Sequence, residues 1–120
     1  MLEAITPILQ LLAFSALATD CAQTAHWIEG TAEEPILSPA GWPTYELNPI
    51  LAGHPEKREA YFAWWRRVAE AAPRMLSPPV ATALLAWIAI EDGQTVLRNN
   101  RFSQEAGFPV YWMVAWQWHF

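Results

Sequence analysis

The first 56 residues of the chain contain no lysine and no arginine. All seven basic residues lie from Lys57 onward, whereas seven of the twelve acidic residues precede that position. No part of the chain carries the long basic run or the stacking pattern expected of a nucleic-acid-binding protein, so that class is excluded. The unequal distribution of charge can orient a membrane protein, because lysine and arginine tend to stay on the cytoplasmic side.

Charged residues are scarce overall, and cysteine is nearly absent. Only 16% of the residues are charged, against about 25% in an average soluble protein. Hydrophobic residues make up 53% of the chain and eight tryptophans are present; tryptophan favours interfaces, where its ring and its N–H are both satisfied. The single Cys21 excludes an internal disulfide. This composition predicts membrane association, although the mean hydropathy of +0.07 is low for a chain buried entirely in lipid.

The chain also lacks an uncharged segment as long as a standard membrane span. Its three segments without Asp, Glu, Lys or Arg cover residues 4–19, 75–90 and 106–120, whereas a perpendicular transmembrane helix needs about 20 apolar residues. Tilting, or flanking side chains such as Arg74 that reach toward the interface, can lengthen them. These segments are therefore either short membrane spans or helices of a compact soluble core.

The N-terminal segment could also be read as a signal peptide. Glu3 and the absence of a basic residue near it favour an uncleaved membrane anchor over a signal peptide that is removed.

Local sequence signals predict an all-α protein, a small helical membrane protein of three to four helices with a long proline-rich loop after the first. Residues 4–27 form the first predicted helix, with Pro7 in its first turn. Residues 30–55 hold five prolines and three glycines, which predicts a loop without regular structure. We expect residues 1–120 to form a single domain.

Two further helices are predicted after this loop. Residues 57–72 repeat apolar side chains at helical spacing and are followed by Pro73, which predicts an amphipathic helix that ends there. Ser77 followed by two prolines is typical of a helix start, and residues 78–98 are predicted as a helix closed by the basic run "RNNR". Residues 108–120 alternate apolar and partly polar side chains, as a strand does, but helix is favoured because no partner strand is evident.

Several polar residues are costly in an apolar setting unless they bond one another. Asp20, Gln23 and Thr24 stand at i, i+3 and i+4, so they share one helix face. The segment "YELNPILAGHP" offers an Asn-Pro turn whose Glu and Asn side chains can reach back to Gln23 and Thr24 and close the helix end. The predicted constellation, either structural or ligand-binding, comprises Asp20, Gln23, Thr24, Glu46, Asn48, Pro49, His54, Glu91 and Asn99.

The order of these motifs resembles a known group of proteins. The motifs are Asp20-Cys-Ala-Gln-Thr24, Glu46-Leu-Asn-Pro-Ile-Leu, His54-Pro55, Tyr61-Phe62, a late Glu91, and Arg98-Asn99. They span about residues 20–100 and resemble small uncharacterised membrane proteins of tailed bacteriophages and prophages. The resemblance implies a helical protein of the bacterial inner membrane and brings no established activity with it.

The expected function is therefore non-enzymatic, with no catalytic residue, cofactor or metal assigned. The three histidines are widely separated and belong to no metal-binding motif. The expected partners are membrane lipid and either a second copy of the chain or a host envelope protein. The aromatic C-terminus is the predicted contact surface, and its candidate interface residues are Trp112, Trp116 and Trp118.

Two alternatives remain open from the sequence. The first is a soluble helical interaction module or virion-associated module that docks through the aromatic C-terminus. The second is a membrane-embedded metal-dependent enzyme, because carboxylates and one histidine can together hold a divalent ion. Its candidate ligands are Asp20, Glu46, His54 and Glu91.

Overall fold

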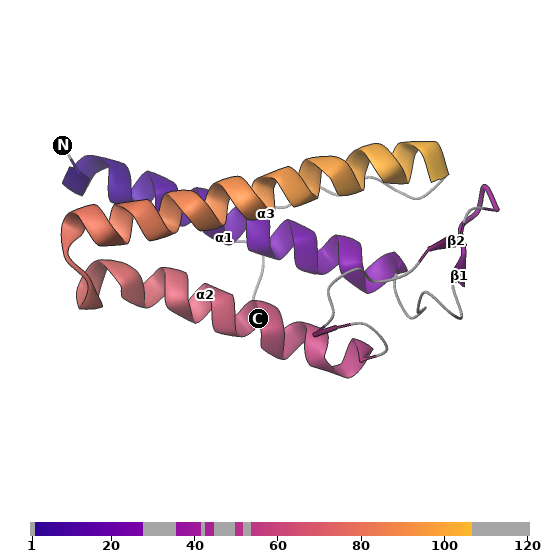
Figure 1. Cartoon of the computed structure of the whole chain (residues 1–120), viewed down its shortest axis with the longest axis horizontal. Helices are drawn as coiled ribbons and strands as arrows, with labels where there is room; N and C mark the ends of the chain where they lie inside the picture. The colour runs from indigo at the N-terminus through magenta and orange to yellow at the C-terminus, as the bar shows by residue number, and fades with distance from the viewer. Residues whose placement is uncertain (1, 28–35, 42, 45–49, 52–53, 107–120) are drawn as a thin grey trace.

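Three long helices make up most of the described structure, and they confirm the all-α prediction. The computed structural model describes residues 2–27, 36–41, 43–44, 50–51 and 54–106. Within these residues the helices are α1 (Leu2–Trp27), α2 (Arg58–Met75) and α3 (Pro78–Ala106). Figure 1 shows α1 and α3 running side by side in the same direction, with α2 returning along them in the opposite direction. The predicted C-terminal segment 108–120 lies outside the described residues.

Helix α2 does not end before Pro73, as the sequence predicted, but continues through it to Met75. A proline inside a helix has no N–H, so the carbonyl four residues earlier loses its usual donor. That carbonyl belongs to Ala69, and the side chain of Gln10 from α1 donates to it at 3.1 Å and to the Glu70 carbonyl at 3.3 Å. A neighbouring helix thus replaces the hydrogen bond that Pro73 removes.

Helix α3 is also longer than predicted, since it passes through the "RNNR" run and ends only at Ala106. The run predicts a helix end because positive charge is favourable at a helix C-terminus. Asparagine also has low helix propensity. In the structure Asn100 is buried and Asn99 is half-buried, and both bond to side chains of α1. Packing against α1 therefore outweighs the local preference of the two asparagines.

The described parts of the predicted loop contain short regular pieces. Strands β1 (Ile36–Leu37) and β2 (Pro43–Thr44) pair antiparallel. The connection includes Gly41, whose φ of 87° is a conformation that glycine adopts without steric cost. A 3₁₀ turn, η1 (Pro55–Lys57), then leads directly into α2. The prediction of a loop without any regular structure was therefore wrong in detail, although each strand has only two residues.

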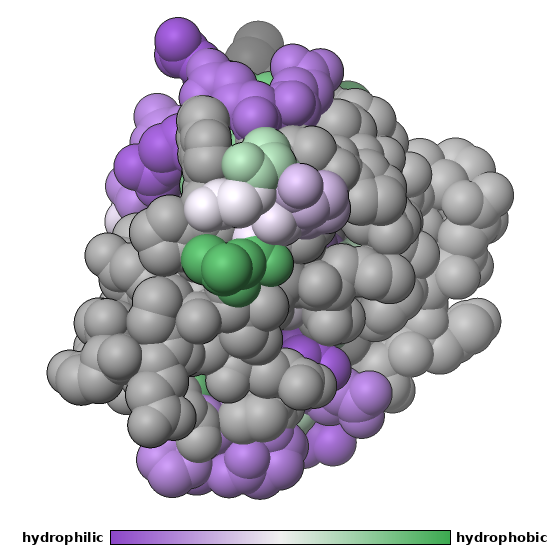
Figure 2. Space-filling model, turned by 90° about the vertical axis from the view of Figure 1, so that its right-hand side faces the viewer, coloured by the Kyte–Doolittle hydropathy of each residue, from purple (hydrophilic) through white to green (hydrophobic). Residues whose placement is uncertain are grey.

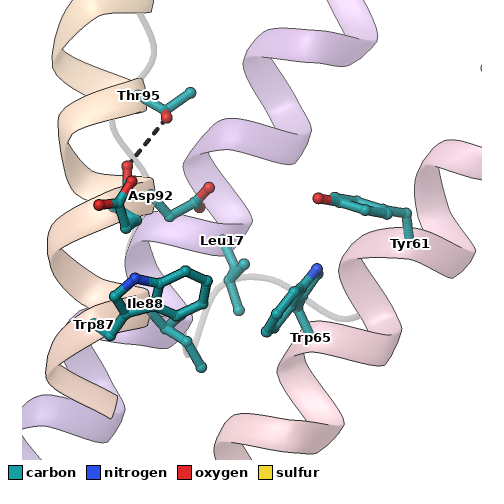
Figure 3. A pocket seen from close by; sticks show the side chains of 8 residues that line it. Leu17, Tyr61, Trp65, Trp87, Ile88, Asp92 and Thr95 are labelled. Atoms are coloured by element: carbon teal, nitrogen blue, oxygen red, sulfur yellow. Dashed lines mark hydrogen bonds between the residues drawn. The ribbon is translucent and has the colours of Figure 1, made fainter. Parts of the chain in front are cut away.

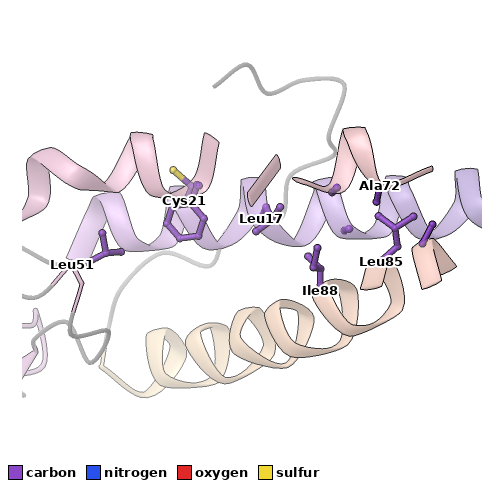
Figure 4. Packing of buried hydrophobic residues seen from close by; sticks show 10 residues of the cluster. Leu17, Cys21, Leu51, Ala72, Leu85 and Ile88 are labelled. Carbon is purple, nitrogen blue, oxygen red and sulfur yellow. The ribbon is translucent and has the colours of Figure 1, made fainter. Parts of the chain in front are cut away.

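The core lies along the line where the three helices meet (Figure 4). Half of its residues have small side chains, which let helix backbones approach one another closely. Larger apolar side chains fill the remaining space, and Leu85 is completely buried. The buried cluster comprises Ala13, Leu17, Cys21, Leu51, Phe62, Ala69, Ala72, Ala81, Leu85 and Ile88.

Much of the apolar surface of α1 and α3 remains outside this core. Segments Ala4–Thr24 of α1 and Pro78–Phe102 of α3 are long and apolar enough to cross a membrane. In an 18-residue window of each segment, only 33% and 22% of the residues, respectively, are buried within the protein. Large apolar side chains therefore face outward on both helices; the most exposed are Ile8, Leu11, Leu12, Val80, Trp87, Ile90 and Leu97.

The end of the molecule at which α3 terminates has a different surface. Figure 2 views this end and shows mostly hydrophilic described residues, with one small hydrophobic patch between them. Arg98 and Arg101 are exposed on the last turns of α3, together with Gln104 and Glu105. The described surface thus changes from apolar to polar along the length of α3.

Candidate functional site

The polar residues predicted to share one face of α1 do so, and that face is directed at α3. Asp20, Gln23 and Thr24 are all buried, and Gln23 has no exposed surface. Their partners come from the second half of α3. We call this group of six residues the interhelix polar cluster: Asp20, Gln23 and Thr24 of α1 with Asp92, Asn99 and Asn100 of α3.

Gln23 makes the largest number of described hydrogen bonds in this cluster. Its Nε2 donates to Oδ1 of Asn100 at 2.7 Å and to the backbone carbonyl of Val96 at 3.2 Å. Its Oε1 accepts from Nδ2 of Asn99 at 3.1 Å. One buried amide therefore uses both its donor and its acceptor to join the two helices, which offsets the cost of removing it from water.

Asp20 lies one turn earlier and is held from both helices. Its Oδ1 accepts from the Thr24 hydroxyl at 3.3 Å and from Nδ2 of Asn99 at 3.4 Å. The carboxyl group of Asp92 lies within hydrogen-bonding range of the Asp20 carboxyl. A hydrogen bond between two carboxyl groups requires a proton on one of them.

The acid that approaches Asp20 is Asp92, not the predicted Glu91. Glu91 is exposed, and its described bond is made by its backbone carbonyl, which accepts from the Thr95 hydroxyl at 3.1 Å. The reason is the position of each residue around the helix. Asp92, Val96 and Asn99 stand at i, i+4 and i+7 and share one face, whereas Glu91 points about 100° away from Asp92 around the helix axis. This shared face could be read from the sequence, but the sequence does not show that it is the face that meets α1.

Sequence reasoning also missed Asn100 and the carbonyl of Val96. Both partners face Gln23, and Asn100 is almost fully buried. The available signal was a pair of adjacent asparagines just after an apolar helical stretch, which the prediction interpreted as a helix end. A backbone carbonyl has no sequence signal of its own.

The loop residues of the predicted constellation do not join the cluster within the described structure. Glu46, Asn48 and Pro49 lie outside the described residues, as do Trp112, Trp116 and Trp118. His54 is exposed, and its Nδ1 lies 3.1 Å from Oε1 of Glu56. The backbone N–H of Glu56 and the His54 ring hold the pKa of the Glu56 carboxyl below its ordinary value. The described partners of Gln23 come from α3 rather than from the loop.

A cavity of about 170 Å³ opens beside the polar cluster, where all three helices meet. Its walls are mostly aromatic and aliphatic, with a carboxyl group on α3 at one side (Figure 3). Trp87 of α3 and Trp65 of α2 approach each other there, and the Tyr61 hydroxyl is directed toward the other two helices. The described residues that line it are Leu17, Tyr61, Trp65, Trp87, Ile88, Glu91, Asp92 and Thr95.

The described residues offer little for metal or nucleophilic chemistry. No group of three or more His, Cys, Asp or Glu side chains in the described ranges can hold a metal ion. Cys21 is a free thiol, but it is buried in the core beside Leu17 and Phe62, away from the described surface. The arrangement is suited to joining two helices and to enclosing a small ligand.

Comparison with known proteins returns no relative: no family model, no curated protein and no solved structure matches the chain.

Proposed function

We propose that the chain is a small non-enzymatic integral membrane protein of the bacterial inner membrane, encoded by a phage or prophage. Helices α1 and α3 cross the lipid as a parallel pair joined by the interhelix polar cluster. The protein acts by packing its helices against a second copy or against a host envelope protein. The resemblance of its motifs to small phage membrane proteins supports the origin, and the distribution of polar and apolar side chains supports the location.

One observation carries the membrane assignment: α1 and α3 bury Gln23 and Asn100 between them and expose large apolar side chains. Gln23 has no exposed surface, whereas Ile8 and Ile90 are 60% and 57% exposed. In water the opposite arrangement is favourable, because burying apolar surface is the main driving force of folding. In lipid, polar groups must find partners inside the protein. The arrangement therefore fits lipid as the surrounding medium.

Helix α2 indicates where a partner binds. It runs alongside α1 and α3 in the bundle (Figure 1). If those two helices cross the membrane, α2 therefore lies at the same depth in the lipid. Arg66 is half-buried and stacks over the Phe14 ring at 4.6 Å, but Arg67, Glu70 and Arg74 are exposed. A centrally placed arginine facing lipid costs about 2.5–3.5 kcal/mol. The charged face of α2 therefore points to protein or water, and we assign it to the partner.

Membrane fractionation tests the location. We expect the protein to remain in the membrane pellet after washes with high salt and with alkaline carbonate, and to be released by detergent. Recovery in the soluble fraction would contradict the proposal. Solubility without detergent, with a stable complex that is lost when residues 108–120 are deleted, would instead identify a soluble module that docks through its C-terminus.

A matched pair of arginine substitutions sharpens this test. Ile90→Arg places a charge on the outward face of a proposed span, so we expect less of the protein to insert, because of the cost of about 3 kcal/mol in lipid. Ala60→Arg places the same charge on the exposed first turn of α2, outside both candidate spans, and we expect normal insertion. Equal insertion of the two variants would show that Ile90 does not face lipid.

A further inference from the structure

The cavity beside the polar cluster combines three aromatic side chains with two carboxyl groups. Tyr61 and Trp65 come from α2, whereas Trp87, Glu91 and Asp92 come from α3 (Figure 3). Its volume of about 170 Å³ is close to that of an engineered cavity of about 150 Å³ that binds benzene. The cavity therefore has room for a ligand of about six non-hydrogen atoms.

The aromatic rings form adjoining walls of this cavity. The centroids of Trp65 and Trp87 are 5.9 Å apart, and their planes are inclined at 49°. That separation leaves no space for a ligand between the rings, but a ligand on the cavity side can contact both. Trp64 packs edge-on against Trp65 with centroids 4.9 Å apart, so the Trp65 ring has a second aromatic neighbour. The aromatic walls are thus formed before any ligand binds.

The charges around the cavity favour a cation. Glu91 is exposed at its edge, and Oδ2 of Asp92 is buried without a hydrogen-bond partner among the described residues. No lysine or arginine belongs to the lining. Arg98 approaches one edge, where it donates to the Thr95 hydroxyl at 3.3 Å. Aromatic faces and carboxylates both attract positive charge.

We infer that this cavity binds an organic ammonium cation. Such a cation within about 6 Å of an aromatic centroid is attracted by the ring, most strongly by tryptophan. The exposed carboxyl group of Glu91 balances its charge. A metal ion is less well served, because indole and phenol rings are poor metal ligands and only two carboxyl groups are present. The ammonium group belongs either to a free small molecule or to a lipid headgroup, and only the lipid source depends on the membrane location proposed above.

Choline and its uncharged analogue test the inference directly. 3,3-Dimethylbutan-1-ol has the shape of choline with carbon in place of the charged nitrogen. We expect choline to bind saturably to the full chain in a non-ionic detergent, followed through the indole N–H signals of Trp65 and Trp87. The analogue is expected to bind at least about tenfold more weakly, which corresponds to about 1.4 kcal/mol of cation-specific interaction. Equal affinity for the two compounds, or no choline binding, overturns the inference.

Substitutions in the lining supply a second readout. Trp87→Leu keeps an apolar wall but removes the aromatic face, and Glu91→Gln removes one charge at nearly constant shape. We expect each to weaken choline binding by about fivefold or more. Glu59→Gln makes the same change at the exposed start of α2, outside the cavity, and is expected to bind choline as the wild type does. Unchanged affinity in both lining variants, or an equal loss in Glu59→Gln, overturns the assignment of the site.

Lipid nanodiscs identify the source of the ammonium group. If a headgroup occupies the cavity, phosphatidylethanolamine in the nanodisc raises the apparent Kd for choline relative to nanodiscs of phosphatidylglycerol alone. If the natural ligand is a free cation, the two Kd values agree; either result supports an ammonium site. A soluble protein that still prefers choline over its analogue would refute the membrane proposal and leave this inference intact.

Discussion

The contact between α1 and α3 has two halves with different chemistry. Toward the start of both helices, Ala13 and Leu17 meet Ala81, Leu85 and Ile88 in an apolar core. Toward their ends, the contact is made by the interhelix polar cluster. Apolar contacts are non-directional, whereas hydrogen bonds require particular atoms opposite one another. We infer that the apolar half supplies most of the stability and that the polar half fixes which residues of the two helices face each other.

The largest expected effect comes from the apolar half. Leu85→Ala removes a completely buried side chain, and we expect the free energy of unfolding to fall by about 3 kcal/mol, from lost burial and from the cavity left behind. Tryptophan fluorescence during denaturant titration in mild detergent measures this change. Leu97→Ala is the matched control, because Leu97 is 60% exposed on the same helix and should change stability by less than about 0.5 kcal/mol.

The same experiment also tests the division of roles between the halves. In Leu85→Ala the polar cluster is untouched, so the helices should keep their alignment despite the loss of stability. Cysteines introduced in place of Ala86 and Ala89, paired in turn with one in place of Leu12, report that alignment through cross-linking yields in a Cys21→Ala background. A changed cross-linking pattern in Leu85→Ala would show that the apolar half helps to set the register.

The polar half is expected to be less important for stability and more important for alignment. Gln23→Leu removes the amide that binds Asn99, Asn100 and the Val96 carbonyl. We expect a loss of about 2 kcal/mol, because buried amide groups on α3 lose their partners, and we expect a broader cross-linking pattern. Gln94→Leu, at an exposed position of α3, should change neither quantity. A Gln23→Leu variant with wild-type cross-linking would refute the role in alignment.

A hydrogen bond between α1 and α2, outside both halves of the α1–α3 contact, permits a test by double substitution. Gln10 donates to the Ala69 carbonyl that Pro73 leaves without a donor. We expect Gln10→Ala to cost about 1 kcal/mol, because a part-buried carbonyl is then unsatisfied. Pro73→Ala restores a backbone donor, so the cost of Gln10→Ala should nearly disappear in that background. Identical costs in both backgrounds would mean that Gln10 acts only through packing.

Sequence reasoning located the helices well and misjudged where two of them end. The charge-free segment 4–19 lies within α1, most of the segment 75–90 lies within α3, and nearly all of the helical repeat of residues 57–72 lies within α2, because these signals are local. The third charge-free segment lies outside the described residues from residue 107 onward. The errors occurred at Pro73 and at Asn99-Asn100, where a local rule for ending a helix was overruled. In each case a side chain of α1 bonds to the helix at that point, and no local pattern reveals such a contact.

The candidate site was also predictable only as far as its residues belong to one helix. Asp20, Gln23 and Thr24 could be placed on one face because they belong to a single helix, and the structure brings Asn99 to that face. Choosing between Glu91 and Asp92 required knowing which side of α3 meets α1, which depends on the packing of the whole bundle. The cavity depends on side chains from three helices, so the sequence contained its residues without indicating that they meet.

Substitution of Gly93 is expected to give the smallest change in the free energy of unfolding, and the change is stabilising rather than destabilising. It lies inside α3 beside Asp92, and a Cβ built at this position meets no atom within 4 Å. Glycine costs about 0.5–1 kcal/mol relative to alanine within a helix, so Gly93→Ala should stabilise the protein by about that amount. Ala83→Gly, at an exposed position in the apolar half of α3, should destabilise by a similar amount. If Gly93→Ala instead weakened the protein, α3 would need flexibility next to the polar cluster, and the two halves would differ in dynamics as well as in chemistry.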